Sequence, residues 1–239
     1  MQGVLQEITL SDNIFYSLFL AYIVQLLIYF VIAGAVSLIY GSMRNVLGVG
    51  ALIDDRKLKP NQRRREILSS LMNCGIYALF MVACCRVSDA IVPSSFLEAA
   101  LQIGGFLLFF DFINYFTHRL LHTKKCKRFH NHHHQSIRVT PWSTLSLHPV
   151  ETILNQIPYL LFVLIFPVSS LMVMVFYIWF MVGMANGHSN YNPFANVKGW
   201  GMAKRYFGFH QAHHEYGRYN FGFIGTHWDW LFGTIAKDK

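Results

Sequence analysis

Eight histidines of this chain fall into three short boxes with the spacing of metal ligands. Residues i, i+3 and i+4 lie on one face of a helix, so each box presents its imidazoles together. Neutral imidazole is the commonest nitrogen ligand of first-row transition metals. Eight imidazoles exceed what one ion takes, so the sequence predicts two metal ions. The boxes are His118-x3-His122, His130-x2-His133-His134 and His210-x2-His213-His214.

The composition places these boxes beside a membrane. Of the 239 residues, 54% are hydrophobic and 13% are charged, whereas about 25% are charged in soluble domains. Apolar runs long enough to cross about 30 Å of hydrocarbon should be helices, because lipid offers no partners for the backbone. No Pro/Gly/Ser-rich linker interrupts the chain, so a single membrane domain is expected over 1–239. The expected helices lie near 14–40, 67–90, 96–117 and 151–186, the last range forming a hairpin that turns at 167–170.

The positive charges indicate how the chain is oriented. Nineteen of the 20 Lys and Arg residues lie in 44–65, 119–138 and 198–239, between the apolar runs. This is the positive-inside pattern, and no recognition module accompanies the charge, so nucleic acid is not an expected partner. The pattern predicts an outside N-terminus, with the His-rich parts 118–150 and 187–239 in the cytoplasm. The expected fold is all-α: an integral, multi-pass membrane protein of about four transmembrane helices, capped by a cytosolic helical His-rich domain.

Other polar residues are candidates for a role near the metals. Asp111 lies seven residues before His118 on the same helix face, where its carboxylate is expected to accept the second ring N–H of a ligand histidine. His148, which precedes Pro149, is expected to orient another ligand or to bind metal itself. For His227 a structural or ligand-orienting role is expected.

Other metal and redox chemistries lack their motifs. The four cysteines form no CxxC pair, and three of them lie in apolar runs, so buried thiols are expected. No CxxCH or GxGxxG motif is present. The chain also lacks the ExxH pairs of soluble di-iron bundles and the HExxH of zinc proteases.

Together these boxes resemble the fatty acid hydroxylase/sterol desaturase superfamily of membrane di-iron enzymes. The resemblance covers roughly residues 100–236 and implies a four-helix transmembrane scaffold with a cytosolic His-rich cap. It is carried by DFINYFTHRLLH, HNHHH, HPVE at 148–151, NGHSNYNP at 186–193 and HQAHHEYGRYNFGFIGTHWDWLFGT.

The resemblance implies a ninth ligand beyond the three boxes. His188 matches a ligand that these enzymes carry between the second and third boxes. One turn later, where relatives often have another ligand, this chain has Asn192, so that place is filled by Asn192, by water or by nothing. The implied ligands are His118, His122, His130, His133, His134, His188, His210, His213 and His214.

The expected function is hydroxylation of a lipid C–H bond, on a fatty acyl, sterol, carotenoid or similar substrate from the bilayer. O2 is the co-substrate, two iron ions are the cofactor, and zinc is a substitute in a purified sample. Electrons are expected from a ferredoxin, a cytochrome or a flavoprotein reductase. Two alternatives stay open: desaturation at the same site, and a metal-binding membrane protein without catalysis. The expected location is the bacterial inner membrane or the endoplasmic reticulum.

Overall fold

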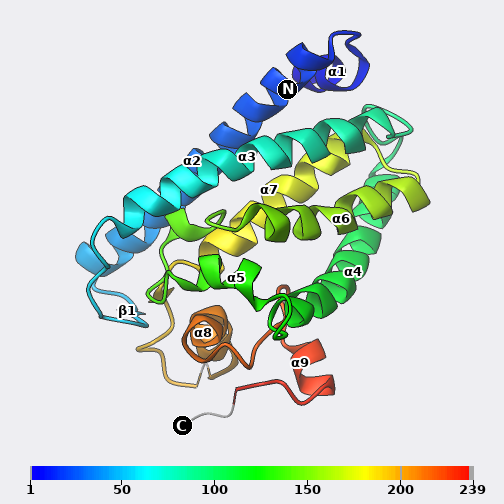
Figure 1. Ribbon diagram of the computed structural model, residues 1–239. Helices are drawn as coiled ribbons and strands as arrows, with labels where there is room; N and C mark the ends of the chain where they lie inside the picture. Colours follow the sequence, from blue (N-terminus) through cyan, green and yellow to red (C-terminus); the bar gives the residue numbers. More distant parts are fainter. Residues whose placement is uncertain (1, 200, 237–239) are drawn as a thin grey trace.

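Four long apolar helices form the scaffold of the molecule (Figure 1). The computed structural model describes the fold of residues 2–199 and 201–236, and the side chains of these residues except 201–205. The described residues do not include 1, 200 and 237–239. All of these fall within the expected single domain, and residues 200 and 237–239 also fall within the expected His-rich region 187–239. The four helices are long and apolar enough to cross a membrane, as predicted. They are α2 (Ile14–Asn45), α3 (Gln62–Arg86), α4 (Phe96–Leu121) and α7 (Ser170–Gly187).

The helices extend beyond the apolar runs that revealed them. At 1.5 Å per residue the 32 residues of α2 measure about 48 Å, whereas the hydrocarbon layer is about 30 Å thick. Helical hydrogen bonding continues into polar sequence, so α2 runs on past residue 40, and α4 runs past residue 117 to include the first half of the first His box. The helix ends therefore project from the lipid and carry residues that face water.

Side-chain caps fix where two of these helices begin. The Asn13 side chain accepts a hydrogen bond of 3.1 Å from the Tyr16 backbone N–H at the start of α2. Ser95 accepts a bond of 3.1 Å from the Glu98 N–H at the start of α4. Each cap satisfies a backbone donor that has no partner within the helix. A short helix that the sequence analysis did not predict, α1 (Gln2–Leu10), precedes α2 and buries Leu5 and Ile8 against the bundle.

The predicted hairpin over 151–186 is present as two helices of unequal length. The first is α6 (Pro149–Ile165), which begins at a proline in its first turn, and the second is α7. With 17 residues α6 is shorter than the four candidate spans. It packs on α3 and α4. The aromatic core lies here: the rings of Phe106 and Phe176 stack with centroids 3.8 Å apart.

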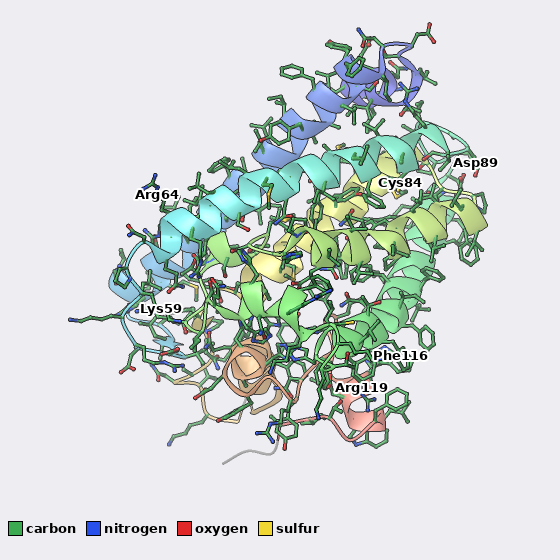
Figure 2. All side chains as sticks on the ribbon, viewed as in Figure 1. Lys59, Arg64, Cys84, Asp89, Phe116 and Arg119 are labelled. Carbon is green, nitrogen blue, oxygen red and sulfur yellow. The ribbon has the colours of Figure 1, made fainter. Side chains whose placement is uncertain are left out.

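The smaller elements gather at one end of the bundle, the lower end in Figure 1. The charges follow this polarity: Lys59, Arg64 and Arg119 lie toward this end, and Asp89 lies at the opposite end (Figure 2). A two-residue antiparallel ladder joins the loop after α2 to the loop after α7. These elements are β1 (Ala51–Leu52), α5 (Lys127–His134), the 3₁₀ turn Pro141–Ser143, β2 (Tyr191–Asn192), α8 (Gly201–Tyr216) and α9 (His227–Leu231).

Candidate metal centre

The lower end of the bundle brings histidines from four helices together. His118 lies in the last turn of α4, and His122 caps that helix. The second box lies on α5, the third box lies on α8, and His188 caps α7. Eight of the nine predicted ligands form two groups of four, in each of which one ligand atom per histidine lies within 4.8 Å of the others.

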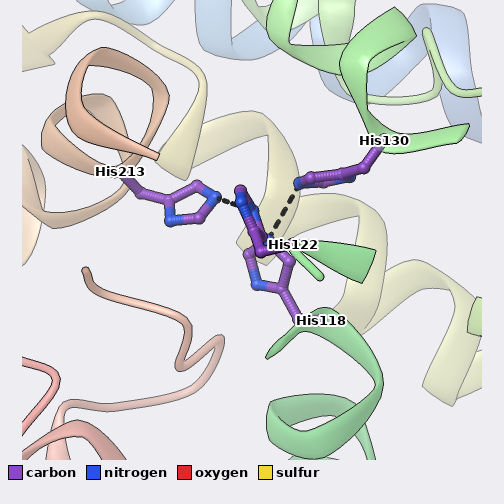
Figure 3. Close-up of side chains that lie close together, drawn as sticks. All are labelled: His118, His122, His130 and His213. Carbon is purple, nitrogen blue, oxygen red and sulfur yellow. Dashed lines mark hydrogen bonds between the residues drawn. The ribbon is translucent and has the colours of Figure 1, made fainter. Parts of the chain in front are cut away.

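The first quartet consists of His118, His122, His130 and His213 (Figure 3). The Nε2 atoms of His118 and His130 are 3.1 Å apart, as are those of His122 and His213. Residues from α4, α5 and α8 therefore converge on one point, although up to 95 positions separate them in the sequence (213 minus 118).

The second quartet consists of His133, His188, His210 and His214. The Nε2 of His188 is 3.1 Å from that of His133 and 3.2 Å from that of His210. The Nε2 of His214 is 3.1 Å from those of His133 and His210. All four rings are buried or half-buried.

The ninth predicted ligand, His134, touches a ring of each quartet. Its Nε2 is 3.0 Å from the Nε2 of His130. Its ring stacks on that of His214 with a centroid separation of 4.6 Å. His134 thus lies against both quartets, and the structure brings all nine predicted ligands together.

Hydrogen bonds on the far side of the rings test whether metal fits. The Nδ1 of His133 is 3.3 Å from the Ser146 carbonyl, and the Nδ1 of His188 is 2.8 Å from the Met184 carbonyl. A carbonyl only accepts, so each Nδ1 carries the proton and each neutral ring has a bare lone pair on Nε2. His118 and His213 are fixed in the same way by the carbonyls of Phe221 and Tyr219, at 2.8 and 2.7 Å.

Two lone pairs that face each other at 3.1 Å repel, and the Nε2 atoms of His133 and His188 are such a pair. A cation between them turns this repulsion into two bonds. Metal–nitrogen bonds of about 2.0–2.1 Å separate neighbouring ligand atoms by about 2.8 to 3.4 Å for bond angles between 90° and tetrahedral. The observed Nε2 separations of 3.0 to 3.2 Å lie within this range. The donor sets therefore fit transition-metal ions.

Burial keeps these imidazoles in the neutral form that binds metal. Desolvation, which disfavours the charged form, is the first cause for each of the eight histidines outside the helical span of α4, and neighbouring imidazoles add to it for all of these eight but His188. The pKa of His122 falls to about 2, and the pKa values of His134 and His188 fall to about 4. The pKa lies well below its usual value for His130, His133, His210, His213 and His214.

Glu151 performs the task that the sequence analysis assigned to Asp111. Its Oε1 lies 2.6 Å from the Nδ1 of His130, and both side chains are almost fully buried. Its Oε2 is buried with no hydrogen-bond partner among the described residues. A carboxylate that accepts the second ring N–H fixes the tautomer of a ligand histidine. In the sequence, Glu151 could have been found as the acidic residue of the HPVE motif, at the start of an apolar helix.

The expected partner of Asp111, a ligand histidine, is wrong. Its Oδ1 accepts the Ile224 N–H at 3.1 Å, and its Oδ2 lies 2.8 Å from both Trp228 Nε1 and His227 Nε2. None of these groups belongs to a quartet. Asp111 faces the C-terminal segment because α9 packs beside α4, a tertiary contact that helix periodicity does not reveal. His227 accordingly has a structural role in this contact.

Asp229 is a second functional carboxylate that the sequence analysis missed. It is fully buried, and its two oxygens accept the N–H groups of Phe221 and Gly222 at 2.8 and 2.6 Å. The Phe221 carbonyl in turn accepts from His118. Asp229 therefore fixes the peptide that orients a predicted ligand. A Cβ on Gly222 would lie 2.3 Å from the Gly225 carbonyl oxygen, so this tight turn requires glycine.

Two other candidates have local contacts. His148 caps α6, where its Nδ1 accepts the Val150 N–H at 3.2 Å, and it belongs to neither quartet. The side-chain oxygen of Asn192 accepts the Phe194 N–H at 3.0 Å, in the turn after β2. Ligation by Asn192 stays a prediction.

An apolar wall adjoins the imidazoles. Two cavities of about 40 Å³ each lie on either side of Phe223, which lines both together with Met184 and His210. The first also contacts His188, and the second also contacts histidines of both quartets. The volume of each cavity is close to the volume that one water molecule occupies in liquid water, about 30 Å³. A lipid would therefore reach the imidazoles only after Phe223 or its neighbours move.

Comparison with known proteins agrees with this geometry. The chain is 32% identical to the Delta(7)-sterol 5(6)-desaturase of Leptosphaeria maculans over 142 residues, which are 57% of this chain and 37% of that protein. It is 28% identical to the lathosterol oxidase of Homo sapiens over 205 residues, 78% of this chain and 66% of that protein. The chain thus spans less than two thirds of the length of these relatives.

No solved structure matches the chain significantly. The family model described as fatty acid hydroxylase matches residues 103–234, which include all nine predicted ligands and make up more than half of the chain. The chain therefore belongs to the fatty acid hydroxylase family, as its motifs predicted.

Proposed function

We propose that this protein is a membrane oxidoreductase that desaturates a sterol-like lipid with O2 and two external electrons. The observation that carries the proposal is the pair of imidazole quartets whose lone pairs face one another beside an apolar wall. The names of the relatives, sterol desaturase and lathosterol oxidase, favour desaturation. Hydroxylation, the main expectation from the sequence, is the second candidate, supported by the description of the matching family.

The proposed cofactor is a pair of iron ions, one in each quartet. His134 and the carboxylate-bound His130 lie where the quartets meet. When bound, two irons supply the electrons and the oxygen activation that attack on an unactivated C–H bond requires. Zinc fits the same nitrogen ligands and is a substitute in purified material.

The protein's own groups then position and shield the reaction. Backbone carbonyls and Glu151 hold the ring protons on Nδ1, which leaves the lone pair of each of these rings on Nε2 free to bind metal. Phe180, Met184 and Phe223 line the cavity next to the rings. These apolar side chains exclude water and present a surface that matches a hydrocarbon substrate.

Orientation and partners complete the proposal. The basic loops at the His-rich end indicate that this end faces the cytoplasm, in the bacterial inner membrane or the endoplasmic reticulum. The electrons come from a separate ferredoxin, cytochrome or flavoprotein. The described bundle has one continuous core of buried residues from α1 to α7, which supports a single domain.

The test is turnover by the purified protein loaded with iron, given reductant, O2, and separate sterol and fatty-acid substrates. The expected product is a sterol that has lost two hydrogen atoms; gain of one oxygen atom would support hydroxylation instead. His133→Ala should abolish turnover, because it removes a ligand of the second quartet. His132→Asn is the matched control on the same helix, since its ring lies outside both quartets and contacts the Ser69 hydroxyl. Iron-loaded protein that oxidises no lipid would identify the non-catalytic alternative.

A further inference from the structure

A third, larger cavity opens where α2 ends, outside the metal centre. Its volume is about 250 Å³, several times that of either cavity beside the imidazoles. Three arginines line it, each from a different segment: Arg44 from α2, Arg63 from α3, and Arg138 from the loop after α5. No Asp or Glu is among its lining residues. All the charged residues of its lining are therefore positive. The carboxylate that interacts with Arg138, that of Asp54, lies outside the lining and is paired with Arg56.

Two of these guanidinium groups have no partner in the part of the chain that the structure describes. Among the described residues, Arg44 and Arg63 make no hydrogen bond or ion pair, and Arg138 donates only to the Arg56 backbone carbonyl. Arg56 shows the contrast: it lies outside the lining and forms an ion pair of 2.6 Å with Asp54. Three like charges that converge on one cavity repel each other, so an anion between them is strongly favoured.

The aromatic lining places this cavity at the level of the lipid headgroups. Tyr40 and Tyr191 stack with ring centroids 5.1 Å apart, and Trp142 lines the cavity beside them. Trp and Tyr are enriched where hydrocarbon meets water, because one end of each ring system is polar. Since Arg44 lies in the last turn of a candidate span, its charge is at the same depth.

We propose that this cavity binds the phosphate of an anionic phospholipid headgroup from the same membrane leaflet. Guanidinium groups match phosphate oxygens through paired, charge-assisted hydrogen bonds. The cavity, about 250 Å³, exceeds the roughly 30 Å³ of one water molecule many times over. The proposal is independent of the reaction at the imidazoles.

Occupancy of this site has a structural consequence for the metal centre. Ser189 and Asn190 line the cavity and directly follow His188 of the second quartet. Asn190 also bonds to the loop before α3, through the Asp54 backbone N–H and carbonyl. A ligand that joins α2, α3 and the loop after α5 therefore stabilises the loop next to His188, and binding raises the unfolding temperature by mass action.

The experiment titrates the full-length protein in a neutral detergent with three probes. These are dioctanoyl phosphatidylglycerol, dioctanoyl phosphatidylcholine and inorganic phosphate, with binding followed by native mass spectrometry and by the unfolding temperature. Arg44→Gln and Arg63→Gln should each weaken phosphatidylglycerol binding about tenfold, the loss expected for a charge-assisted hydrogen bond. Because neither arginine has a partner among the residues that the structure describes, metal content and the ligand-free unfolding temperature should stay unchanged.

Arg64→Gln is the matched control. It removes the same charge from the next position of α3, but Arg64 does not line the cavity and projects outward (Figure 2). Selective, arginine-dependent binding of phosphatidylglycerol over phosphatidylcholine supports the proposal. Equal stabilisation by inorganic phosphate alone would overturn the lipid assignment and identify a soluble phosphate as ligand. Equal weakening by Arg64→Gln, or no preference for the anionic lipid, would overturn the site.

Discussion

At the scale of single residues, the hydrogen bonds to the Nδ1 atoms orient the predicted ligands. Without such hydrogen bonds, each imidazole could carry its proton on either ring nitrogen. Four of them are fixed by backbone carbonyls, and His130 is held by a carboxylate that lies almost fully inside the protein. Glu151 therefore acts as a positioning residue through His130 and does not need to touch substrate.

Replacement of Glu151 tests this role. Glu151→Ala should lower metal affinity about 10- to 100-fold, because the His130 ring loses the acceptor that orients it. Glu151→Gln keeps an oxygen acceptor of the same shape and should retain more of the affinity. Competition with a chelator, followed by metal analysis, measures both. Glu98→Gln, which removes a half-buried carboxylate in the first turn of α4, at the end away from the imidazoles, is the control. If all three variants hold metal equally, Glu151 has no orienting role.

At the scale of elements, the C-terminal segment closes the metal centre by docking on α4. Asp111 receives hydrogen bonds from the Ile224 backbone and the Trp228 indole, and the ring of Trp228 lies against that of Phe112. The same segment supplies the Phe221 carbonyl that orients His118. The buried carboxylate of Asp111 thus holds the C-terminal segment whose Phe221 carbonyl orients His118 of the first quartet.

Asp111→Ala should therefore loosen this segment. It leaves the Ile224 and Trp228 donors without their acceptor, which costs about 1–3 kcal/mol for each buried group that water cannot reach. We expect a lower unfolding temperature and faster proteolysis after residue 219, with weaker metal binding as a secondary effect. Asp89→Asn, an exposed acid at the opposite end of the bundle, is the comparison. Unchanged proteolysis of the Asp111 variant would contradict the docking role.

At the scale of the whole molecule, bound metal would connect helices that are far apart in the sequence. α4, α5 and α8 meet at the first quartet, and α5, α7 and α8 meet at the second. Without a cation, facing lone pairs push these helices apart. With a cation, each quartet cross-links three helices, so stability and metal content are coupled.

Metal removal and single-ligand variants test this coupling. The protein should bind two ions, and His118→Ala and His188→Ala should each reduce the content toward one, since they lie in different quartets. Chelation should lower the unfolding temperature, because metal at 100 times its dissociation constant contributes about 2.7 kcal/mol per site. Metal analysis and thermal unfolding of the same samples provide the measurement. Loss of both ions from either variant would show one shared site in place of two.

Local rules of sequence were enough to predict the long helices and the histidines that meet at the candidate metal centre. Apolar runs longer than a bilayer is thick can only be helices, and histidines at i, i+3 and i+4 must share a face, so both follow from local rules. Counting the crossings also put the three boxes at one end of the bundle. Each of these inferences concerns neighbours along the chain.

The division of the predicted ligands between the two quartets depends on how the helices pack in three dimensions. The second and third boxes are each split: His130 and His213 join the first quartet, while His133, His210 and His214 join the second. Side chains one turn apart on a helix can point to different ions once another helix packs between them. The partners of Asp111 and Glu151 were decided in the same way, because the packing of α6, α9 and α4, and not sequence spacing, sets which carboxylate meets which imidazole.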